Sequence, residues 1–551
     1  MFKPCLVYNR DSIRKKVFSM SFKENSCQQL SFSDSFSGLT AREQKALEKS
    51  WAKIFADEIF PAIDEKRFSV LYSENASRPN TPVNVIVGAL IIKELFDYSD
   101  DEMVENLMLD LHLQYALHTT SFEEQPLSDK TLSRFRKRCY DYETLHNEDL
   151  YHDCVKELSG IIAKMMGING RVRRMDSIMI ESNIRKLSRM ELIYTCIAKL
   201  AAYIEKTNNS LLPDNMKHYV DPNDFNKVIY HQRSTETENK MQILLADADK
   251  LLSLCGSDYE NIKEYELFVR CLSEQTIVES EKRRLRKKED GTMNSNVLQN
   301  PSDPEATFRS KAGKSHRGYV ANLEESVGKE GSVITDYQYE QNIHSDSQFL
   351  KDHLERMKKQ EERVVLVTDG AYSGNENKDI ANTKNIELIT TSLTGREAPD
   401  IIADFEFNAE GTKILLCPAG HAPKSCTYMA PSSQCSVSFD RNLCANCPHC
   451  NQCKPKIFKR VAKIITSKTA HERAKIQRSM QSEEFKNYAR LRNGVETVPS
   501  NLRRNYHLEN LPRGKQRGKF SFGCKIMALN FKKFFNFMKG WGNYAPNPVI
   551  A

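Results

Sequence analysis

Residues 362–374 read ERVVLVTDGAYSG, and the rest of the predicted sheet can be built outward from this stretch. An apolar run bounded by charged residues and by Gly370 predicts a buried strand that ends at Asp369. Open sheets place functional groups at the carboxyl ends of such strands. Asp369 is therefore a candidate functional acid, and the alternative is a solvated aspartate that caps a turn.

The neighbouring segments extend this strand into a sheet. Residues 375–385 predict a helix and 386–393 another strand, while 316–327 and 332–343 predict a hairpin followed by a helix at 345–360. Further upstream, RVRRMDSIMIESNI at 171–184 alternates like a strand and carries a second acid, Asp176. A helical stretch, 185–290, separates it from the hairpin. The order predicts a multidomain α+β or α/β protein with a mixed sheet flanked by helices.

The pattern over residues 41–168 is helical. Thr81 and Pro82 suit the start of one helix, Ser99 and Glu102 form a capping box for another, and Ser128 suits the cap of a third. The third helix is basic, and short helices ending in a basic one are typical of DNA-binding modules. Its candidate DNA contacts are Arg134, Arg136, Lys137 and Arg138.

Charge is unevenly distributed along the 551 residues, whose formal net charge is +7. Residues 454–540 contain 22 Lys and Arg but only 5 Asp and Glu, so this stretch alone carries +17. A concentrated basic region predicts a polyanionic partner, although a solvated helical surface is the alternative. No apolar run approaches the ~20 residues of a membrane span, and the N-terminus does not look like a secretory signal, so we expect a cytoplasmic protein without membrane contact.

Four cysteines at three-residue spacing, Cys444, Cys447, Cys450 and Cys453, form overlapping CxxC steps. Such steps hold tetrahedral Zn²⁺ in many proteins, and a cluster in a reducing compartment favours a metal over disulfides. Cys417, His421, Cys426 and Cys435 lie close enough in sequence to complete or share the site. An iron–sulfur cluster and a set of unliganded thiols are the alternatives.

Asp176 and Asp369 suit the chemistry of phosphodiesters. Two divalent metals, held by carboxylates, stabilise the attacking and leaving oxygens of an in-line displacement. Mg²⁺ or Mn²⁺ prefers such oxygen ligands, so two or three acids from distant segments are sufficient. We expect two such ions and no nucleotide cofactor.

Several motifs resemble bacterial insertion-sequence transposases of the Asp-Asp-Glu (DDE) class, which have a ribonuclease-H-like catalytic domain. They are RMDSIMIESNIRKLSRMELIY from 174, KAGKSHRGYVANLEES from 311 and VVLVTDGAYSG from 364. Residues 69–138 resemble the helical N-terminal domain of the same transposases. The resemblance implies that Asp176 lies on strand one, that Asp369 follows strand four, and that a glutamate comes from a later helix.

The family signature places an arginine four residues before the glutamate and a basic residue seven after it. Arg492, Glu496 and Arg503 in YARLRNGVETVPSNLRR meet this spacing, although the signature tyrosine falls on Ala489 and its lysine on Arg503. Pro499 requires a helix to start or break near the glutamate. The rival acids are Glu483, Glu484 and Glu509. Expected phosphate contacts from this region are Arg492, Arg503, Arg504, Arg513, Lys515, Arg517 and Lys519, the last four in a glycine-containing basic loop.

The resemblance implies a transposase that binds the terminal repeats of an insertion sequence as double-stranded DNA, works as a homodimer, and cleaves and joins strands. A catalytically inactive DNA-binding remnant and a metal-dependent nuclease without strand transfer are the alternatives. The expected domains are a flexible arm (1–40), a helical DNA-binding domain (41–168), a catalytic domain (170–184 with 306–408 and 470–540), a helical insertion (185–305) and a Cys-rich segment (409–469).

Overall fold

The computed structural model describes residues 20–25, 36, 38–73, 78–119, 127–128, 130–229, 236–279, 281–291, 294–311, 313–393 and 397–541. The arm expected over residues 1–40 lies mostly outside them. The chain divides into two compact units. The first unit comprises Met1–Gly170, Asp176–Phe349 and Thr497–Ala545, and the second comprises Arg171–Met175, Leu350–Glu496 and Pro546–Ala551. None of the described helices is both long and apolar enough to span a bilayer.

The first unit begins with helices packed around a central apolar one. In α4 (Val83–Phe96) every residue from Val83 to Ile92 is buried, as expected for a helix surrounded on all sides. A Cβ at Gly88 would meet the Leu117 side chain, so that side chain packs directly on the helix backbone there. The other helices and helical turns are α2 (Ala41–Glu48), α3 (Trp51–Ile54), η1 (Phe55–Ile59), η2 (Phe60–Ala62), η3 (Lys66–Leu71), α5 (Asp100–Leu109), α6 (Leu111–Ala116), α7 (Thr131–His146) and α8 (Leu150–Met165).

Two of the three predicted helix starts need correction. The capping box of Ser99 and Glu102 is present at α5. At α4, however, Thr81 is not the cap: the buried Glu65 carboxylate accepts hydrogen bonds from the N–H groups of Val83 (2.9 Å) and Asn84 (3.3 Å). The Glu65 carboxylate, from a separate segment, thus caps the N-terminus of α4 in place of a local residue. At α7 the helix begins at Thr131, after Ser128, whose N–H donates to the Thr131 hydroxyl.

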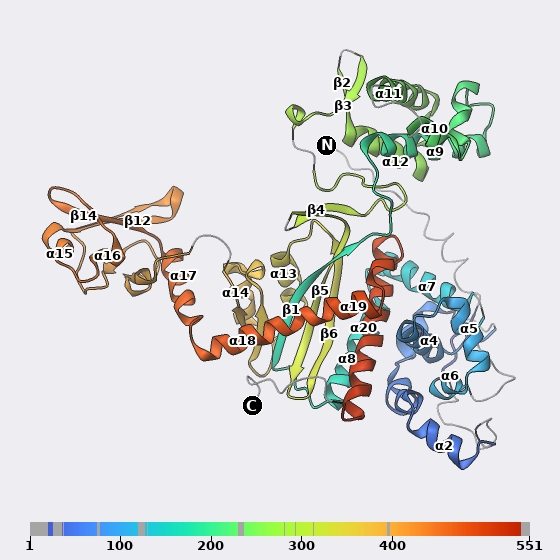
Figure 1. The fold of residues 1–551 in the computed structure, drawn as a ribbon, viewed down its shortest axis with the longest axis horizontal. Helices are drawn as coiled ribbons and strands as arrows, with labels where there is room; N and C mark the ends of the chain where they lie inside the picture. Colours follow the sequence, from blue (N-terminus) through green and yellow to red (C-terminus); the bar gives the residue numbers. More distant parts are fainter. Residues whose placement is uncertain are drawn as a thin grey trace. The chain divides into compact units, whose positions relative to one another are not determined.

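The main sheet runs in the order β4-β5-β1-β7-β8, with β6 also pairing β5. Figure 1 labels β1, β4, β5 and β6 of this sheet. β5 (Lys314–Gly328) and β6 (Gly331–Gln341) form the predicted antiparallel hairpin, and β4 (Thr307–Lys311) pairs with the first residues of β5. β1 (Val172–Glu181) pairs with β7 (Val364–Thr368) in parallel, and β7 pairs in parallel with β8 (Ile386–Thr390). The helical elements between these strands are α13 (Asp346–Arg356), η8 (Gly370–Tyr372) and α14 (Asn375–Thr383).

Residues 185–305 form a helical region with its own hydrophobic core. Buried tyrosines tie its elements together, since Tyr194 donates to Asp224 (2.6 Å) and Tyr219 donates to Asp247 (2.9 Å). The end of this region is not helical as predicted, because residues 276–285 form a hairpin. The elements are α9 (Arg189–Thr207), η4 (Asp214–Val220), α10 (Asp224–Ile229), α11 (Thr237–Leu254), η6 (Ser257–Tyr259), α12 (Lys263–Gln275), β2 (Thr276–Glu279), β3 (Lys282–Leu285) and η7 (Lys288–Asp290).

The Cys-rich segment belongs to the second unit and is built on a small antiparallel sheet of order β11-β12-β14-β13. Its core is small, with Val437 and Phe439 among the buried side chains. The elements of this region are η9 (Asp400–Asp404), β9 (Glu406–Phe407), β10 (Ile414–Leu416), β11 (Ser425–Met429), η10 (Ala430–Ser432), β12 (Gln434–Asp440), α15 (Arg441–Ala445), α16 (Cys450–Cys453), β13 (Lys456–Ile457), β14 (Val461–Thr466) and α17 (Lys468–Ser479).

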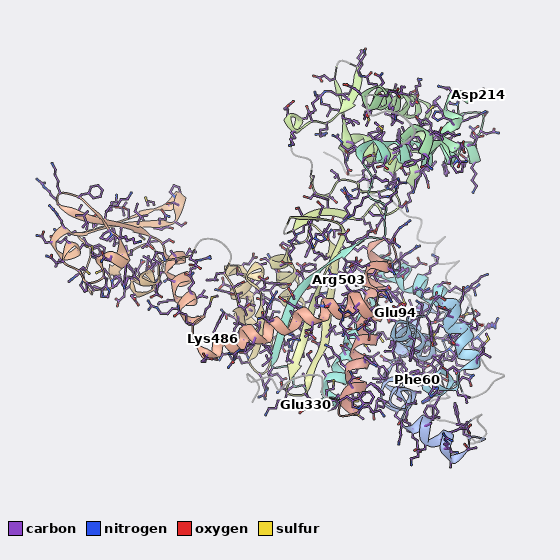
Figure 2. The ribbon with its side chains drawn as sticks, in the orientation of Figure 1. Phe60, Glu94, Asp214, Glu330, Lys486 and Arg503 are labelled. Atoms are coloured by element: carbon purple, nitrogen blue, oxygen red, sulfur yellow. The ribbon has the colours of Figure 1, made fainter. Side chains whose placement is uncertain are left out.

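The chain continues through α18 (Glu483–Asn493), η11 (Gly494–Glu496), α19 (Thr497–Asn505) and η12 (Leu508–Asn510) to the long helix α20 (Lys515–Met538). α20 packs against α4, α8 and β6 within the first unit. Two lysines on it make buried ion pairs, Lys525 with Glu94 (2.6 Å) and Lys533 with Glu325 (2.7 Å). Of these residues, Glu94 is labelled in Figure 2. These pairs explain how a basic helix can lie in a core.

Candidate active site

Asp369 follows β7 directly and its position is fixed by the local backbone. Its carboxylate accepts a hydrogen bond from the Ala371 N–H (2.7 Å) and so caps the turn η8. Gly370 donates its N–H to the Ser392 hydroxyl (3.1 Å), and a Cβ at Gly370 would collide with the Ser392 carbonyl. Glycine is therefore required at position 370 by this close approach, while 39% of the Asp369 side chain stays exposed.

Arg492 connects Asp369 with Glu496. One guanidinium nitrogen lies 3.5 Å from Asp369 Oδ2, and the other donates to Glu496 Oε1 at 2.7 Å. The Arg492 side chain is 15% exposed, whereas Glu496 is 65% exposed. Two of the three predicted acids, from distant positions in the sequence, thus contact the same cation in the second unit.

The chain breaks its helix at Glu496, as Pro499 predicts. α18 ends at Asn493, Glu496 ends the short turn η11, and α19 begins at Thr497. Pro499 is then the third residue of α19, where the backbone N–H has no partner within the helix. Glu496 lies four residues after Arg492, about one helical turn, and the two side chains form an i,i+4 ion pair.

Arg174 is a positioning residue that the sequence interpretation missed. It is buried on β1, and its guanidinium donates to the carbonyl oxygen of Leu491 (2.7 Å) near the end of α18. A cation at a helix C-terminus satisfies carbonyls that lack helical partners. Arg174 therefore fixes the end of α18 that carries Arg492. A buried arginine inside a predicted strand is the feature of the sequence from which this role could have been inferred.

Asp176 lies on β1, half-buried, and its carboxylate accepts the N–H of Ser177 (3.0 Å). The parallel register pairs Arg174 with Val367. Asp176 and Asp369 each follow these paired residues by two positions in the sequence. Asp176 remains a predicted site residue.

The rival acids have other partners or positions. Glu483 pairs with Lys486 (2.7 Å) in the first turn of α18, and Glu509 pairs with Arg503 (3.3 Å). Glu484 also lies in the first turn of α18, at the opposite end of that helix from Arg492. Among the four glutamates considered, the contact with Arg492 distinguishes Glu496.

The predicted DNA contacts on α7 differ in their availability. Arg136 is half-buried and bonded to Asp100 (3.2 Å for one of two contacts), and Arg138 lies over the Tyr72 ring at 4.7 Å. Arg134 and Lys137 are exposed, the latter beside Asp141 (3.0 Å) on the same helix. Arg134 and Lys137 are thus better placed for a phosphate than the other two.

The basic run at 513–519 is not the loop that we expected. Gly514, with φ +92°, precedes α20, and Lys515 to Lys519 form its first turns. Gly518 allows the helix to pack against Tyr339, because a Cβ there would meet the phenol ring. Burial alone would lower the pKa of Lys519, but Asp149 (2.6 Å) and Glu143 (3.0 Å) raise it overall. Gly518 therefore serves helix packing, and Gly514 supplies the positive φ before the helix.

The other basic residues of this region vary in exposure. Arg503, labelled in Figure 2, donates to the Met179 carbonyl (2.9 Å), and Arg513 donates to the Asn183 carbonyl (2.7 Å). Lys515 pairs with Glu340 (2.6 Å). Arg504 and Arg517 are exposed. All remain predicted DNA contacts.

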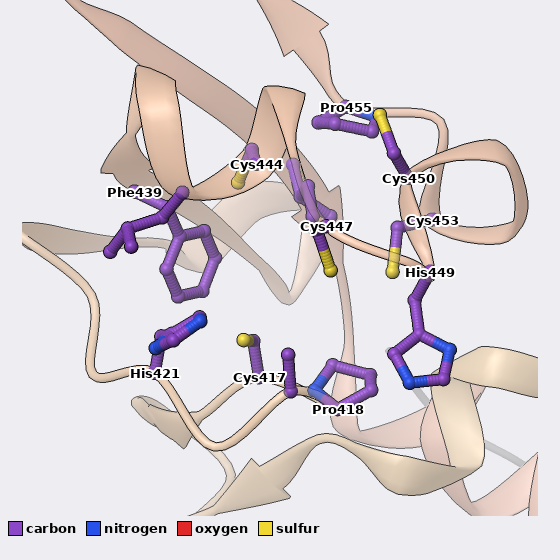
Figure 3. A pocket seen from close by; sticks show the side chains of 13 residues that line it. Cys417, Pro418, His421, Phe439, Cys444, Cys447, His449, Cys450, Cys453 and Pro455 are labelled. Carbon is purple, nitrogen blue, oxygen red and sulfur yellow. The ribbon is translucent and has the colours of Figure 1, made fainter.

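The Cys-rich segment holds a small pocket, shown in Figure 3. Five cysteines and two histidines line it, with apolar walls that include Phe439 and Ile464. Burial and the neighbouring Cys447 and Cys417 thiols raise the pKa of Cys453 to about 11. Among the described residues, no three His, Cys, Asp or Glu side chains stand in an arrangement that could hold a metal ion. The lining residues are Cys417, Pro418, Ala419, His421, Phe439, Leu443, Cys444, Cys447, His449, Cys450, Cys453, Pro455 and Ile464.

Comparisons with known proteins identify two parts of the chain. A family described as "Transposase DDE domain" matches residues 416–535, which include Glu496, Arg492 and the Cys-rich pocket. A second, "Transposase domain (DUF772)", matches residues 43–138, the N-terminal helices. No curated protein and no solved structure matches the chain. Two transposase family models thus match separate segments of the chain, and together they support a DDE transposase of an insertion sequence.

Proposed function

We propose that this transposase binds the terminal repeats of its element and catalyses DNA strand cleavage and strand transfer with Asp176, Asp369 and Glu496. The observation that carries the proposal is the contact of one guanidinium, that of Arg492, with both Asp369 and Glu496. A nearby cation favours the charged form of a carboxylate, and this is the form that binds a metal ion.

The sheet supports a ribonuclease-H-like catalytic domain. Along the chain, and leaving out β4, which pairs only with the first residues of β5, the strands are β1, β5, β6, β7 and β8, and β1 lies between β5 and β7. Asp176 is on the first of these strands and Asp369 follows the fourth, as the family resemblance implies.

The register of β1 and β7 supports the pairing of the two aspartates. Neighbouring parallel strands keep their register from residue to residue unless a bulge intervenes. Arg174 pairs with Val367, so each aspartate follows a paired residue of the two strands by two positions in the sequence. We propose that these carboxylates and Glu496 are the ligands of two Mg²⁺ or Mn²⁺ ions.

The donor set fits such ions, because Asp369 and Glu496 are exposed carboxylates and hard divalent cations prefer oxygen ligands. When bound, the ions would stabilise the attacking and leaving oxygens of an in-line displacement. Arg492 holds Asp369 and Glu496 and balances their charge. The reaction joins a water oxygen, and later a 3′-hydroxyl oxygen, to phosphorus as the bridging oxygen leaves.

Double-stranded DNA would contact the exposed basic residues of α7 and those of the region from Arg503 to Lys519. Terminal repeats come in pairs, so we propose that two copies of the chain act together as a homodimer. Phosphate contacts by Lys and Arg make this binding dependent on salt.

Cleavage of DNA that carries the element's ends tests the catalytic assignment. We expect Mg²⁺- or Mn²⁺-dependent nicking by the full chain, and a loss of at least ~100-fold in Asp176→Asn, Asp369→Asn and Glu496→Gln, since each removes a charged ligand. Asp379→Asn, an exposed acid on α14, and Glu509→Gln are the matched controls and should keep activity. Full nicking by the three site variants would overturn the assignment.

Two further outcomes separate the alternatives. A chain that binds the ends but never cuts them under any metal would be a DNA-binding remnant. A chain that nicks DNA yet fails to join pre-nicked ends to a target would be a nuclease without strand transfer.

A further inference from the structure

The pocket of the Cys-rich segment brings together thiols from two separate stretches of chain. Cys417 follows β10, while Cys444, Cys447 and Cys453 lie on and between α15 and α16. In Figure 3 the sulfurs of Cys447 and Cys453 point into the same space, with Cys417 on the facing wall. The Cys450 sulfur instead points toward Pro455, away from those three.

Tight turns hold these cysteines. The Cys417 N–H donates to the His421 carbonyl (3.0 Å) and Gly420 donates to the Cys417 carbonyl (2.8 Å), a turn that needs Gly420 at φ +78°. In the second stretch, Cys447 donates to the Cys444 carbonyl (3.3 Å). Such turns present side chains on one side of the backbone, as CxxC knuckles do at metals.

The space between the thiols suits a single ion. The cavity measures about 20 Å³, close to what one water-sized particle needs. Its walls are apolar, with Phe439, Leu443 and Ile464 beside the thiols. Thiolates gathered in such surroundings need a positive charge at their centre.

The segment has a small core, with Cys435, Val437, Phe439 and Ile464 among its buried side chains. Small modules with few buried side chains need a disulfide or a metal in addition to their hydrophobic core. Here several large apolar side chains stay more than a third exposed instead of joining the core. They are Leu415, Tyr428, Leu443, Ile457, Phe458 and Ile465.

We propose that Cys417, Cys444, Cys447 and Cys453 bind one structural Zn²⁺, with Cys450 outside the ligand set. Four thiolates are the soft, tetrahedral donor set that Zn²⁺ prefers, and each thiol releases its proton on binding. Because the side chains do not yet stand in a metal-binding arrangement, the sulfurs move inward to Zn–S distances of about 2.3 Å as the ion binds.

Metal content of the purified full-length chain tests this inference. We expect about one zinc per chain in the wild type and in Cys450→Ser, and a loss of most of it in Cys417→Ser. Asp369→Asn should keep its zinc, so a failure of the proposed catalytic site is distinguishable from a failure here. Zinc lost from Cys450→Ser but kept in Cys417→Ser would overturn the ligand set. Iron with visible absorption, or no metal, would overturn the site.

A second measurement does not depend on variants that fold poorly. Replacement of zinc by Co²⁺ in the wild-type chain should give intense tetrahedral bands and strong sulfur-to-cobalt charge transfer, both unchanged in Cys450→Ser. An octahedral spectrum without charge transfer would contradict a four-thiolate site.

Discussion

Arg492 and Asp369 contact each other at 3.5 Å although they lie far apart in the sequence, Arg492 in the last turn of α18 and Asp369 directly after β7. The contact makes Arg492 more than a surface cation near the end of a helix. It links the acid at the end of a parallel strand to the turn that carries Glu496.

Replacing Arg492 by lysine should lower strand cleavage by about 10- to 100-fold while leaving DNA affinity within a few-fold of wild type. A lysine keeps the charge but cannot contact Asp369 and Glu496 with two nitrogens at once. Nicking rates and binding isotherms on the same DNA measure the two effects. Arg490→Lys, an exposed neighbour on α18, is the control. Equal activity of Arg492→Lys and wild type would show that the bridge is not used.

Gly494→Ala should destabilise the second unit by about 1–3 kcal/mol, because the added Cβ meets the Arg174 guanidinium in a packed site. The backbone of Gly494 is ordinary helical, with φ −62°, so the cost comes from space alone. Urea unfolding measures it. Gly256→Ala, where a Cβ meets nothing within 4 Å, should have little effect. A neutral Gly494→Ala would mean that Arg174 moves aside freely.

Lys533→Ala should destabilise the first unit by about 3–5 kcal/mol, because Glu325 is fully buried and would lose the cation that balances its charge. Glu325→Gln in the same chain should recover part of that loss, since the remaining group is then uncharged. Lys532→Ala, on the exposed side of α20, is the matched control. The idea fails if the single and double variants unfold at the same urea concentration.

Arg134→Ala and Lys137→Ala on α7 should each weaken DNA binding and reduce the slope of log K against log salt by about one, the expectation for one lost phosphate contact. Arg136→Ala should mainly reduce stability, because its guanidinium is held by Asp100. Lys164→Ala, exposed on α8, should leave the slope unchanged. Titrations at several salt concentrations check this, and unchanged slopes for both α7 variants would remove α7 from the DNA interface.

The order of strands and helices around Asp369 could be predicted from sequence because each element there carries its own pattern. The apolar run before Asp369 and the alternation around Asp176 are local features, and so is the capping box at Ser99. Pro499 likewise predicted the end of the helix beside Glu496. These elements could be predicted because the residues within each one determine its conformation.

Other features depended on partners distant in sequence. The carboxylate of Glu65 starts α4 in place of Thr81, and Lys282–Leu285 forms a strand because it pairs with β2 despite its helix-forming lysines and arginines. The start of α20 looked like a loop because of Gly514 and Gly518, yet Gly518 is the residue that lets the helix approach Tyr339. Such contacts leave no local pattern.

The hydrogen bond from Arg174 to Leu491 also bears on how this chain tolerates insertions. The end of α18 is anchored to β1 itself, so the place of Glu496 in the second unit depends on that anchor and on α18 lying against β7. Lengthening a loop adds only about 0.6 kcal/mol for each doubling of its length. The stretch between β8 and α18 can therefore acquire, lose or exchange whole modules during evolution while the glutamate stays where it is.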